Sequence, residues 1–183
     1  MADSWLSNTY LVADEDGGTA VLIDAGGPVA PLLEAIDERG LSLTHVLLTH
    51  HHHDHVAELG EVLERHPDVE VLAHPDEREA IMGVTGTIEP GDKLTIGGLE
   101  VEAIHTPGHT GGMLNFLVDG TDLYTGDTLF KGSVGGVRAP PTEPLKSVSP
   151  VNTSVPFTTK LSIPAVWPGC TPVSYTHLTL PTN

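Results

Sequence analysis

The chain has 183 residues, with 25 acidic and 8 basic side chains, 11 histidines and one cysteine. A formal charge of −17 repels phosphate backbones and anionic lipids, which excludes nucleic acid and membrane surfaces as expected partners. One cysteine cannot form an internal disulfide, and no apolar run reaches the roughly 20 residues of a membrane span, so we expect one cytoplasmic globular domain.

Apolar strands alternate with amphipathic helices through the first half of the chain. Pro28 and Gly40 are placed to open and to end the first of these helices. The pattern predicts a βαβαβ unit, with strands at 20–24, 46–48 and 69–72 and helices at 28–39 and 59–63.

Two hairpins are predicted after a short helix around 76–81. In both, apolar and polar side chains alternate on the two sides of a turn. The first hairpin joins 94–96 to 99–103, and the second joins 114–118 to 123–125. The expected class is α/β, with mixed sheets and helices on their outer faces.

The composition changes near Arg138. From 139 to 183, Pro, Thr and Ser make up 22 of 45 residues, only three residues are charged, and no helical or strand period is sustained. We therefore predict a folded domain over 1–138 and an irregular tail over 139–183.

Four consecutive histidines directly follow the second predicted strand, in the segment His50-His51-His52-His53-Asp54-His55. An affinity tag or a solvated polar loop would be an alternative explanation. However, the run is internal and follows a strand, and desolvating several imidazoles without a ligand is costly. Because histidine is the commonest metal ligand, the segment predicts a metal site.

Two later segments strengthen this prediction. Pro107-Gly108-His109 presents a histidine on a tight turn, and Gly126-Asp127 places a carboxylate after a strand. Each is weak alone, because such residues commonly occupy turns and helix caps. Together with the histidine run, they are typical of a metal centre.

These segments, in this order, resemble the motifs of the metallo-β-lactamase fold superfamily of metal-dependent hydrolases. The resemblance covers about 8–138, and the segment 126–133 looks most like the glyoxalase II-like branch. It implies an αββα metallo-β-lactamase-like sandwich with the metals at one edge of the sheets. We expect this sandwich to be C-terminally incomplete in the present chain.

The resemblance implies six metal ligands in two sites. They are His50, His52 and His109 in the first site, and Asp54, His55 and a bridging Asp127 in the second. Two Zn²⁺ ions are implied, the second site being weakened, with iron as the alternative metal. Asp54 would also be the catalytic residue, which orients the metal-bound hydroxide and takes part in proton transfer. Asp24 would accept an imidazole N–H and fix the tautomer of a ligand.

The function implied by the resemblance is metal-dependent hydrolysis of a small thioester, such as a hydroxyacyl-glutathione, by metal-bound hydroxide. One alternative is an iron-dependent persulfide dioxygenase of the same fold. Another is a catalytically inactive metal-binding module. The expected partner is a small-molecule substrate, and the sequence makes no prediction of the oligomeric state.

The tail departs from the family pattern. The family expects a further histidine in a Pro-Gly-His segment, where this chain has Pro168-Gly169-Cys170, so Cys170 is a candidate replacement ligand. Residues 173–182 resemble the translation of a transposon-end sequencing adapter. We therefore expect 173–183 to be non-native sequence that packs poorly, after a frameshifted or misassembled stretch over 139–172.

Overall fold

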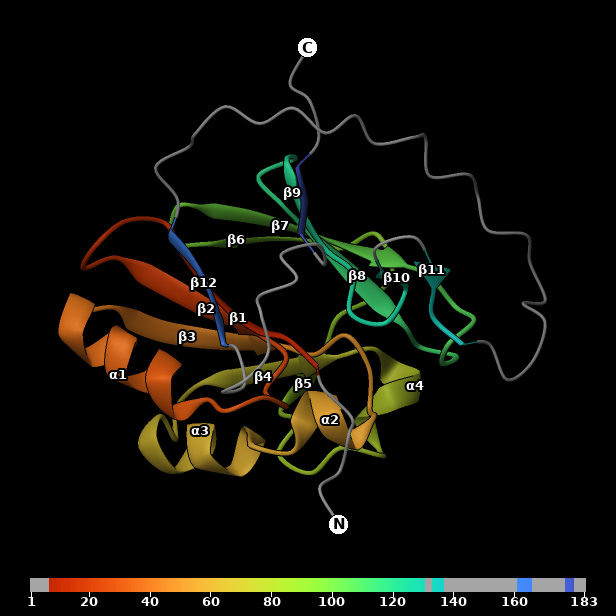
Figure 1. The fold of residues 1–183 in the computed structure, drawn as a ribbon, viewed down its shortest axis with the longest axis horizontal. Coiled ribbons are helices and arrows are strands. Elements are labelled where there is room, and N and C mark those ends of the chain that lie inside the picture. Colours follow the sequence, from red (N-terminus) through yellow and green to blue (C-terminus); the bar gives the residue numbers. More distant parts are fainter. Residues whose placement is uncertain (1–6, 131–132, 137–160, 166–176, 180–183) are drawn as a thin grey trace.

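Two β-sheets lie face to face in the computed structural model, which describes residues 7–130, 133–136, 161–165 and 177–179 (Figure 1). The first sheet has six strands in the order β12-β1-β2-β3-β4-β5. They are β1 (Thr9–Ala13), β2 (Thr19–Ile23), β3 (Ser42–Leu47), β4 (Glu70–Ala73), β5 (Gly86–Thr87) and β12 (Leu161–Ala165). Strands β2 to β5 are parallel, whereas β1 is antiparallel to both of its neighbours.

The second sheet has five antiparallel strands in the order β13-β9-β8-β7-β6. They are β6 (Lys93–Ile96), β7 (Leu99–His105), β8 (Leu114–Val118), β9 (Asp122–Tyr124) and β13 (His177–Thr179). The pairings of β6 with β7 and of β8 with β9 confirm both predicted hairpins. A separate hairpin of β10 (Leu129–Phe130) and β11 (Ser133–Val134) was not predicted.

Four helices accompany the first sheet, namely α1 (Ala30–Arg39), α2 (His53–Val56), α3 (Leu59–Arg65) and α4 (Pro75–Arg78). Helices α1 and α3 connect parallel strands, which confirms the βαβαβ unit. Gly40 ends α1 with a left-handed φ of 63°, as predicted. Among the described residues all helices precede the second sheet in sequence, so the second helical layer of an αββα sandwich has no counterpart there.

Strands β1 to β4 of the first sheet place side chains in an apolar cluster on each face of the sheet. Along β2, Leu22 packs in the cluster that includes Leu33 of α1, whereas Ile23 packs in the cluster that includes Phe116 of the second sheet. Successive side chains of a strand point to opposite faces. The continuous apolar runs that predicted these strands therefore follow from helices on one side and the second sheet on the other.

Two strands lie within 139–183, where the sequence predicted none. Strand β12 pairs with β1, and β13 pairs with β9. Unpaired backbone groups at a sheet edge can recruit a segment whatever its side-chain pattern, which explains why composition missed these strands. The rest of 139–183 lies outside the described residues, so the irregular tail as a whole stays a prediction.

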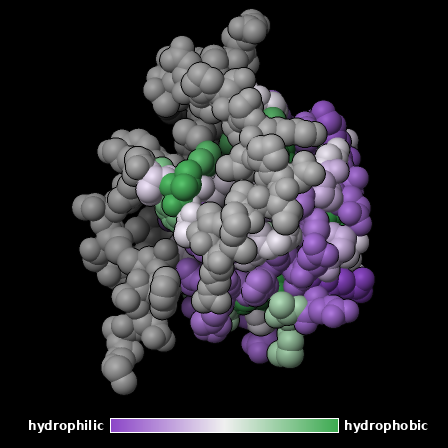
Figure 2. Space-filling model, turned by 90° about the vertical axis from the view of Figure 1, so that its right-hand side faces the viewer, coloured by the Kyte–Doolittle hydropathy of each residue, from purple (hydrophilic) through white to green (hydrophobic). Residues whose placement is uncertain are grey.

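Hydrophilic side chains predominate on the coloured right-hand and lower parts of the face seen in Figure 2. Among the described residues, the large apolar side chains that are exposed are Met82, Phe130 and Val134. No helix in this part of the chain is long and apolar enough to cross a bilayer.

Candidate metal centre

The predicted ligands lie in loops that follow strands of both sheets and in the short helix α2, which carries Asp54 and His55. His50 follows β3, His109 follows β7, and Asp127 follows β9. Parallel pairing of β2 with β3 places Ile23 beside Leu47, so the loops after these two strands begin side by side. The site is therefore assembled from segments far apart in the sequence.

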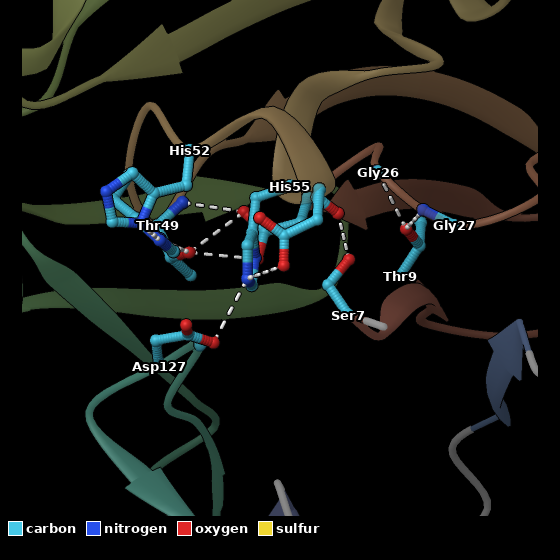
Figure 3. Close-up of polar contacts among 12 residues, drawn as sticks. Ser7, Thr9, Gly26, Gly27, Thr49, His52, His55 and Asp127 are labelled. Carbon is cyan, nitrogen blue, oxygen red and sulfur yellow. Dashed lines mark hydrogen bonds and ion pairs between the residues drawn. The ribbon is translucent and has the colours of Figure 1, made fainter. Parts of the chain in front are cut away.

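The loop after β2 supports the short helix α2. The Ala25 N–H donates to the His55 carbonyl at 2.8 Å, and the Gly26 N–H donates to Thr9 Oγ1 at 3.2 Å (Figure 3). A Cβ on Gly26 would lie 1.5 Å from the backbone oxygen of Asp54. Only glycine allows the backbone that carries Asp54 and His55 to approach so closely.

Four predicted ligands converge in one cluster. The ligand atoms of His50, His52, His109 and Asp127 all lie within 4.8 Å of one another. His52 Nδ1 is 3.0 Å from His50 Nε2 and 2.8 Å from His109 Nε2. Asp127 Oδ2 lies 3.3 Å from His109 Nε2. This cluster corresponds to the predicted first site with the predicted bridging carboxylate beside it.

Hydrogen bonds at Nδ1 of His50 and His109 determine the tautomers of these two imidazoles. Asp24 can only accept from the Thr49 hydroxyl, at 2.9 Å, so Thr49 Oγ1 in turn accepts the Nδ1–H of His50 at 3.0 Å. His109 Nδ1 faces the Gly136 carbonyl at 2.8 Å and must donate to it. In the neutral rings, the lone pairs of both Nε2 atoms therefore point into the cluster, as metal ligation requires.

A second cluster lies beside the first. His55 Nδ1 donates to Asp24 at 2.7 Å, and His55 Nε2 lies 3.1 Å from Asp127 Oδ1 and 3.9 Å from Asp54 Oδ2. Figure 3 shows Asp127 reaching towards His55 from the loop after β9. Because its other oxygen faces His109, Asp127 lies between the two clusters, as expected of a bridging ligand.

Burial and neighbouring charges set the protonation of these groups. Burial and the adjacent imidazoles lower the pKa of His50 far below its usual range, and burial and His109 lower that of His52. Burial also opposes protonation of His55, but the Asp24 and Asp127 carboxylates outweigh it and raise the His55 pKa to about 10. Burial opposes ionisation of Asp127, but the hydrogen bond to His55 lowers its pKa overall.

The donor set fits a divalent metal ion. A neutral His55 would turn the lone pair of Nε2 towards an Asp127 oxygen, so this position needs a positive charge, from a proton or a cation. The lone pairs of the first cluster converge with a carboxylate beside them, and imidazole with carboxylate is the ligand set of catalytic zinc and of non-haem iron. The site thus supports a divalent metal.

The structure brings four of the six predicted ligands into one cluster. The other two, His55 and Asp54, lie beside it, with His55 Nε2 3.1 Å from Asp127 Oδ1 and 3.9 Å from Asp54 Oδ2. Of the two intervening histidines, His53 is exposed and His51 bonds to Glu77 instead of facing the cluster. The candidate ligand Cys170 lies outside the described residues. Metal ligation itself stays a prediction.

Sequence reasoning missed two supporting residues. Thr49 relays a hydrogen bond from His50 to Asp24, but its only signal was its place before the histidines. Glu77 is buried, and hydrogen bonds from His51 and the Gly112 N–H lower its pKa although burial opposes its ionisation. It stands in the charged run 76–79, which is typical of an exposed helix face.

A pocket opens beside the second cluster. Aromatic and aliphatic side chains form much of its wall, including Tyr10, Tyr124 and Phe130, and His55 and Asp127 form its polar side. The rings of Tyr10 and Tyr124 meet edge to face, with centroids 5.0 Å apart. The wall of the pocket therefore presents apolar and aromatic surface next to the candidate metal ligands.

Comparisons with known proteins agree with this geometry. Residues 2–155 match the model of the Metallo-beta-lactamase superfamily. The chain is 39% identical over 127 residues to a hydroxyacylglutathione hydrolase of Gloeobacter violaceus and 44% identical over 133 residues to one of Xylella fastidiosa. These alignments cover 69% and 72% of this chain, and 50% and 49% of the relatives. The chain thus spans about half the length of the curated relatives it matches.

Solved structures show the same fold. The BLEG-1 B3 metallo-beta-lactamase has a TM-score of 0.62 and 25% identity, with 71% of each chain covered. ETHE1 from Myxococcus xanthus has a TM-score of 0.57 and 34% identity, covering 67% of this chain and 52% of that chain. TTHA1623 in a di-iron-bound form has a TM-score of 0.59 and 31% identity, with 73% of each covered. With its sheets, its histidine cluster and a family match over most of its length, the chain belongs to the metallo-β-lactamase superfamily.

Proposed function

We propose that this chain carries the metal site of a hydrolase that cleaves a small thioester of the hydroxyacyl-glutathione type. The convergence of His50, His52, His109 and Asp127 within 4.8 Å carries the proposal. The thioester class is supported by curated relatives named hydroxyacylglutathione hydrolase at 39% and 44% identity. These names favour the hydrolase over the persulfide dioxygenase and over an inactive metal-binding module.

We assign two zinc ions to the site. His50, His52 and His109 would hold the first ion, Asp54 and His55 would hold the second, and Asp127 would lie between them. Three neutral imidazoles are a ligand set of catalytic zinc. When bound, zinc lowers the pKa of coordinated water to about 7 and polarises a substrate carbonyl. The di-iron form of one structural relative makes iron the competing metal.

Asp54 is the group of this chain that we assign to proton transfer. Its side chain is 22% exposed and its Oδ2 lies 3.9 Å from His55 Nε2, so it faces the site and still meets solvent. Asp54 accepts the proton that the attacking water gives up and returns it to the sulfur of the leaving thiol. Asp24 holds the His55 ring in the tautomer with its proton on Nδ1 throughout.

We propose that the acyl part of the substrate binds at the pocket beside His55 and Asp127. Tyr10, Tyr124 and Phe130 give it apolar and aromatic walls, which exclude water from around a thioester carbonyl. The carbonyl of an acyl group held there would lie next to the candidate second site.

Metal analysis together with a thioester assay tests the proposal. The full chain is stripped with a chelator, reloaded with Zn²⁺ or Fe²⁺, and analysed for metal equivalents and for hydrolysis of lactoyl-glutathione. We expect nearly two zinc equivalents and thioester cleavage that disappears with the chelator. A folded chain that binds neither metal would refute the site, and a loaded chain that spares the thioester would refute the substrate class.

A further inference from the structure

Glu77 is a buried carboxylate outside the proposed ligand set. It lies in α4 with a relative exposure of 2%. Its Oε2 accepts the backbone N–H of His51 at 3.0 Å and also contacts His51 Nδ1. Its Oε1 accepts the Gly112 N–H at 2.7 Å. A carboxylate buried so completely costs free energy unless its hydrogen bonds are made, and here both oxygens have partners.

The two oxygens of Glu77 reach two different loops. The His51 N–H lies between His50 and His52, which are two of the proposed ligands. The Gly112 N–H belongs to the loop that carries His109, the third imidazole of the same cluster. One carboxylate therefore spans the two backbone segments that must stay in register for the three imidazoles to converge.

The packing around Gly112 leaves no room for a side chain next to Glu77. A Cβ on Gly112 would lie 2.6 Å from His74 Nδ1 and 2.7 Å from Glu77 Cγ, so any larger residue would push the loop away from α4. His74 also stacks on His105, with ring centroids 4.9 Å apart and planes 10° from parallel. His105 Nε2 in turn bonds to the Gly111 carbonyl at 2.9 Å. Helix α4 and its N-cap residue His74 thus contact both ends of the loop that carries His109.

We propose that Glu77 is a positioning residue that sets the affinity and geometry of the first metal site by tying the His50–His52 segment to the His109 loop. The inference rests on the proposed metal site. It goes beyond that site because Glu77 is not a proposed ligand and acts through the backbone of its neighbours.

The chemistry of the carboxylate makes the proposal specific. Glu77 accepts the backbone N–H groups of His51 and Gly112 and contacts the His51 ring nitrogen, and an ionised carboxylate can accept at both oxygens. The variant Glu77→Gln has the same shape but presents an NH₂ group to one of the two loops. Glu77→Asp keeps the charge but is one methylene shorter and cannot span both loops. Groups that hydrogen-bond to metal ligands change metal affinity by about 10- to 100-fold, and we expect an effect of this size from Glu77, which acts on the backbone next to the ligands.

Zinc affinity of the full chain tests the proposal. Wild type, Glu77→Gln, Glu77→Asp and the matched control Glu79→Gln, whose side chain is exposed on the same short segment, compete with a chromophoric chelator for zinc. We expect affinity at the tighter site to fall about 10- to 100-fold in both Glu77 variants and to stay unchanged in the control. The absorption spectrum of the Co²⁺-loaded protein should shift in the Glu77 variants, because their imidazoles no longer keep the same geometry.

The outcomes separate this inference from the proposed function. Folded Glu77 variants with wild-type affinity and an unchanged cobalt spectrum would overturn the positioning role and leave the metal site standing. Weaker zinc binding would also overturn it if the metal-free protein lost stability by the same free energy, as measured from its melting temperature. Glu77 would then act in folding alone. A folded wild type that binds no metal would overturn both proposals.

Discussion

Replacing Asp24 with asparagine should weaken the second metal site and spare the first. Asp24 Oδ1 accepts the Thr49 backbone N–H at 2.8 Å, and Oδ2 accepts His55 Nδ1–H at 2.7 Å. In Asp24→Asn the side-chain oxygen must face Thr49, because a backbone N–H cannot change its role. The new NH₂ group then faces His55, which can bond to it only by moving its own proton from Nδ1 to Nε2.

The tautomer change sets the size of the effect. A proton on Nε2 points at Asp127, 3.1 Å away, and occupies the lone pair that would bind the metal. To bind the metal, His55 must move this proton back to Nδ1. The move breaks the hydrogen bond from Nε2–H to the Asp127 carboxylate, and a hydrogen bond to a charged group is worth about 1.5–3 kcal/mol. At 1.4 kcal/mol for each factor of ten, this weakens the second site by about 10- to 100-fold. His50 keeps its tautomer, because the Thr49 hydroxyl still donates to the side-chain oxygen at position 24.

Zinc titration against a competing chelator, with elemental analysis at a fixed free zinc concentration, measures the two sites separately. Asp24→Asn should retain one zinc equivalent under conditions where wild type retains two. Asp68→Asn, at an exposed aspartate, is the matched control. A folded Asp24→Asn protein that holds both ions as wild type does, or that loses both ions equally, would refute the tautomer argument.

Three further predictions concern catalysis, pH and packing. Asp54→Asn should lower thioester hydrolysis by about 10²- to 10⁴-fold while the first-site zinc is retained, as shown by steady-state kinetics with metal analysis on the same sample. Asp24 and Asp127 raise the pKa of His55 from 6.5 to about 10 despite its burial, so the metal-free protein has the full stability from this proton below about pH 6.5. That stability is lost as the pH rises through about 10, so metal-free melting temperatures should fall over this range, and a flat profile would contradict the assignment. Gly26→Ala should destabilise the protein by at least about 3 kcal/mol in denaturant unfolding, because its Cβ would meet the Asp54 carbonyl at 1.5 Å. Gly60→Ala, where no atom lies within 4 Å, should be neutral or slightly stabilising.

Periodicity predicted the elements whose side chains decide their environment. The parallel strands β2, β3 and β4 contain apolar runs because both of their faces are covered, and the hairpin turn at Gly97-Gly98 lies where the sequence pattern predicted it. The two-residue strand β5 and the strands β12 and β13 were missed. They owe their place to backbone pairing at a sheet edge, and backbone pairing leaves no mark on residue type.

The candidate ligands could be proposed from the sequence because metal chemistry restricts ligands to a few residue types at characteristic spacing. The groups that hold them could not be predicted in the same way. Glu77 acts on loops 26 and 35 residues away in sequence, through backbone N–H groups that every residue except proline carries. Thr49 could have been replaced in the pattern by any polar residue, and only the 2.9 Å contact with Asp24 reveals its role. A network that ends on backbone atoms is visible only once the fold is known.

Metal binding and folding should be linked in this protein, because the proposed ligands come from loops that follow β3 of the first sheet and β7 and β9 of the second. Without an ion, the cluster brings together imidazole lone pairs and places a buried histidine between two carboxylates, arrangements that need a compensating positive charge. An ion that binds only the folded chain adds RT ln(1 + [L]/Kd), about 4 kcal/mol at a thousandfold excess over Kd. The converging imidazoles of the first cluster therefore oppose folding when the site is empty, whereas a bound ion would join the loops of the two sheets.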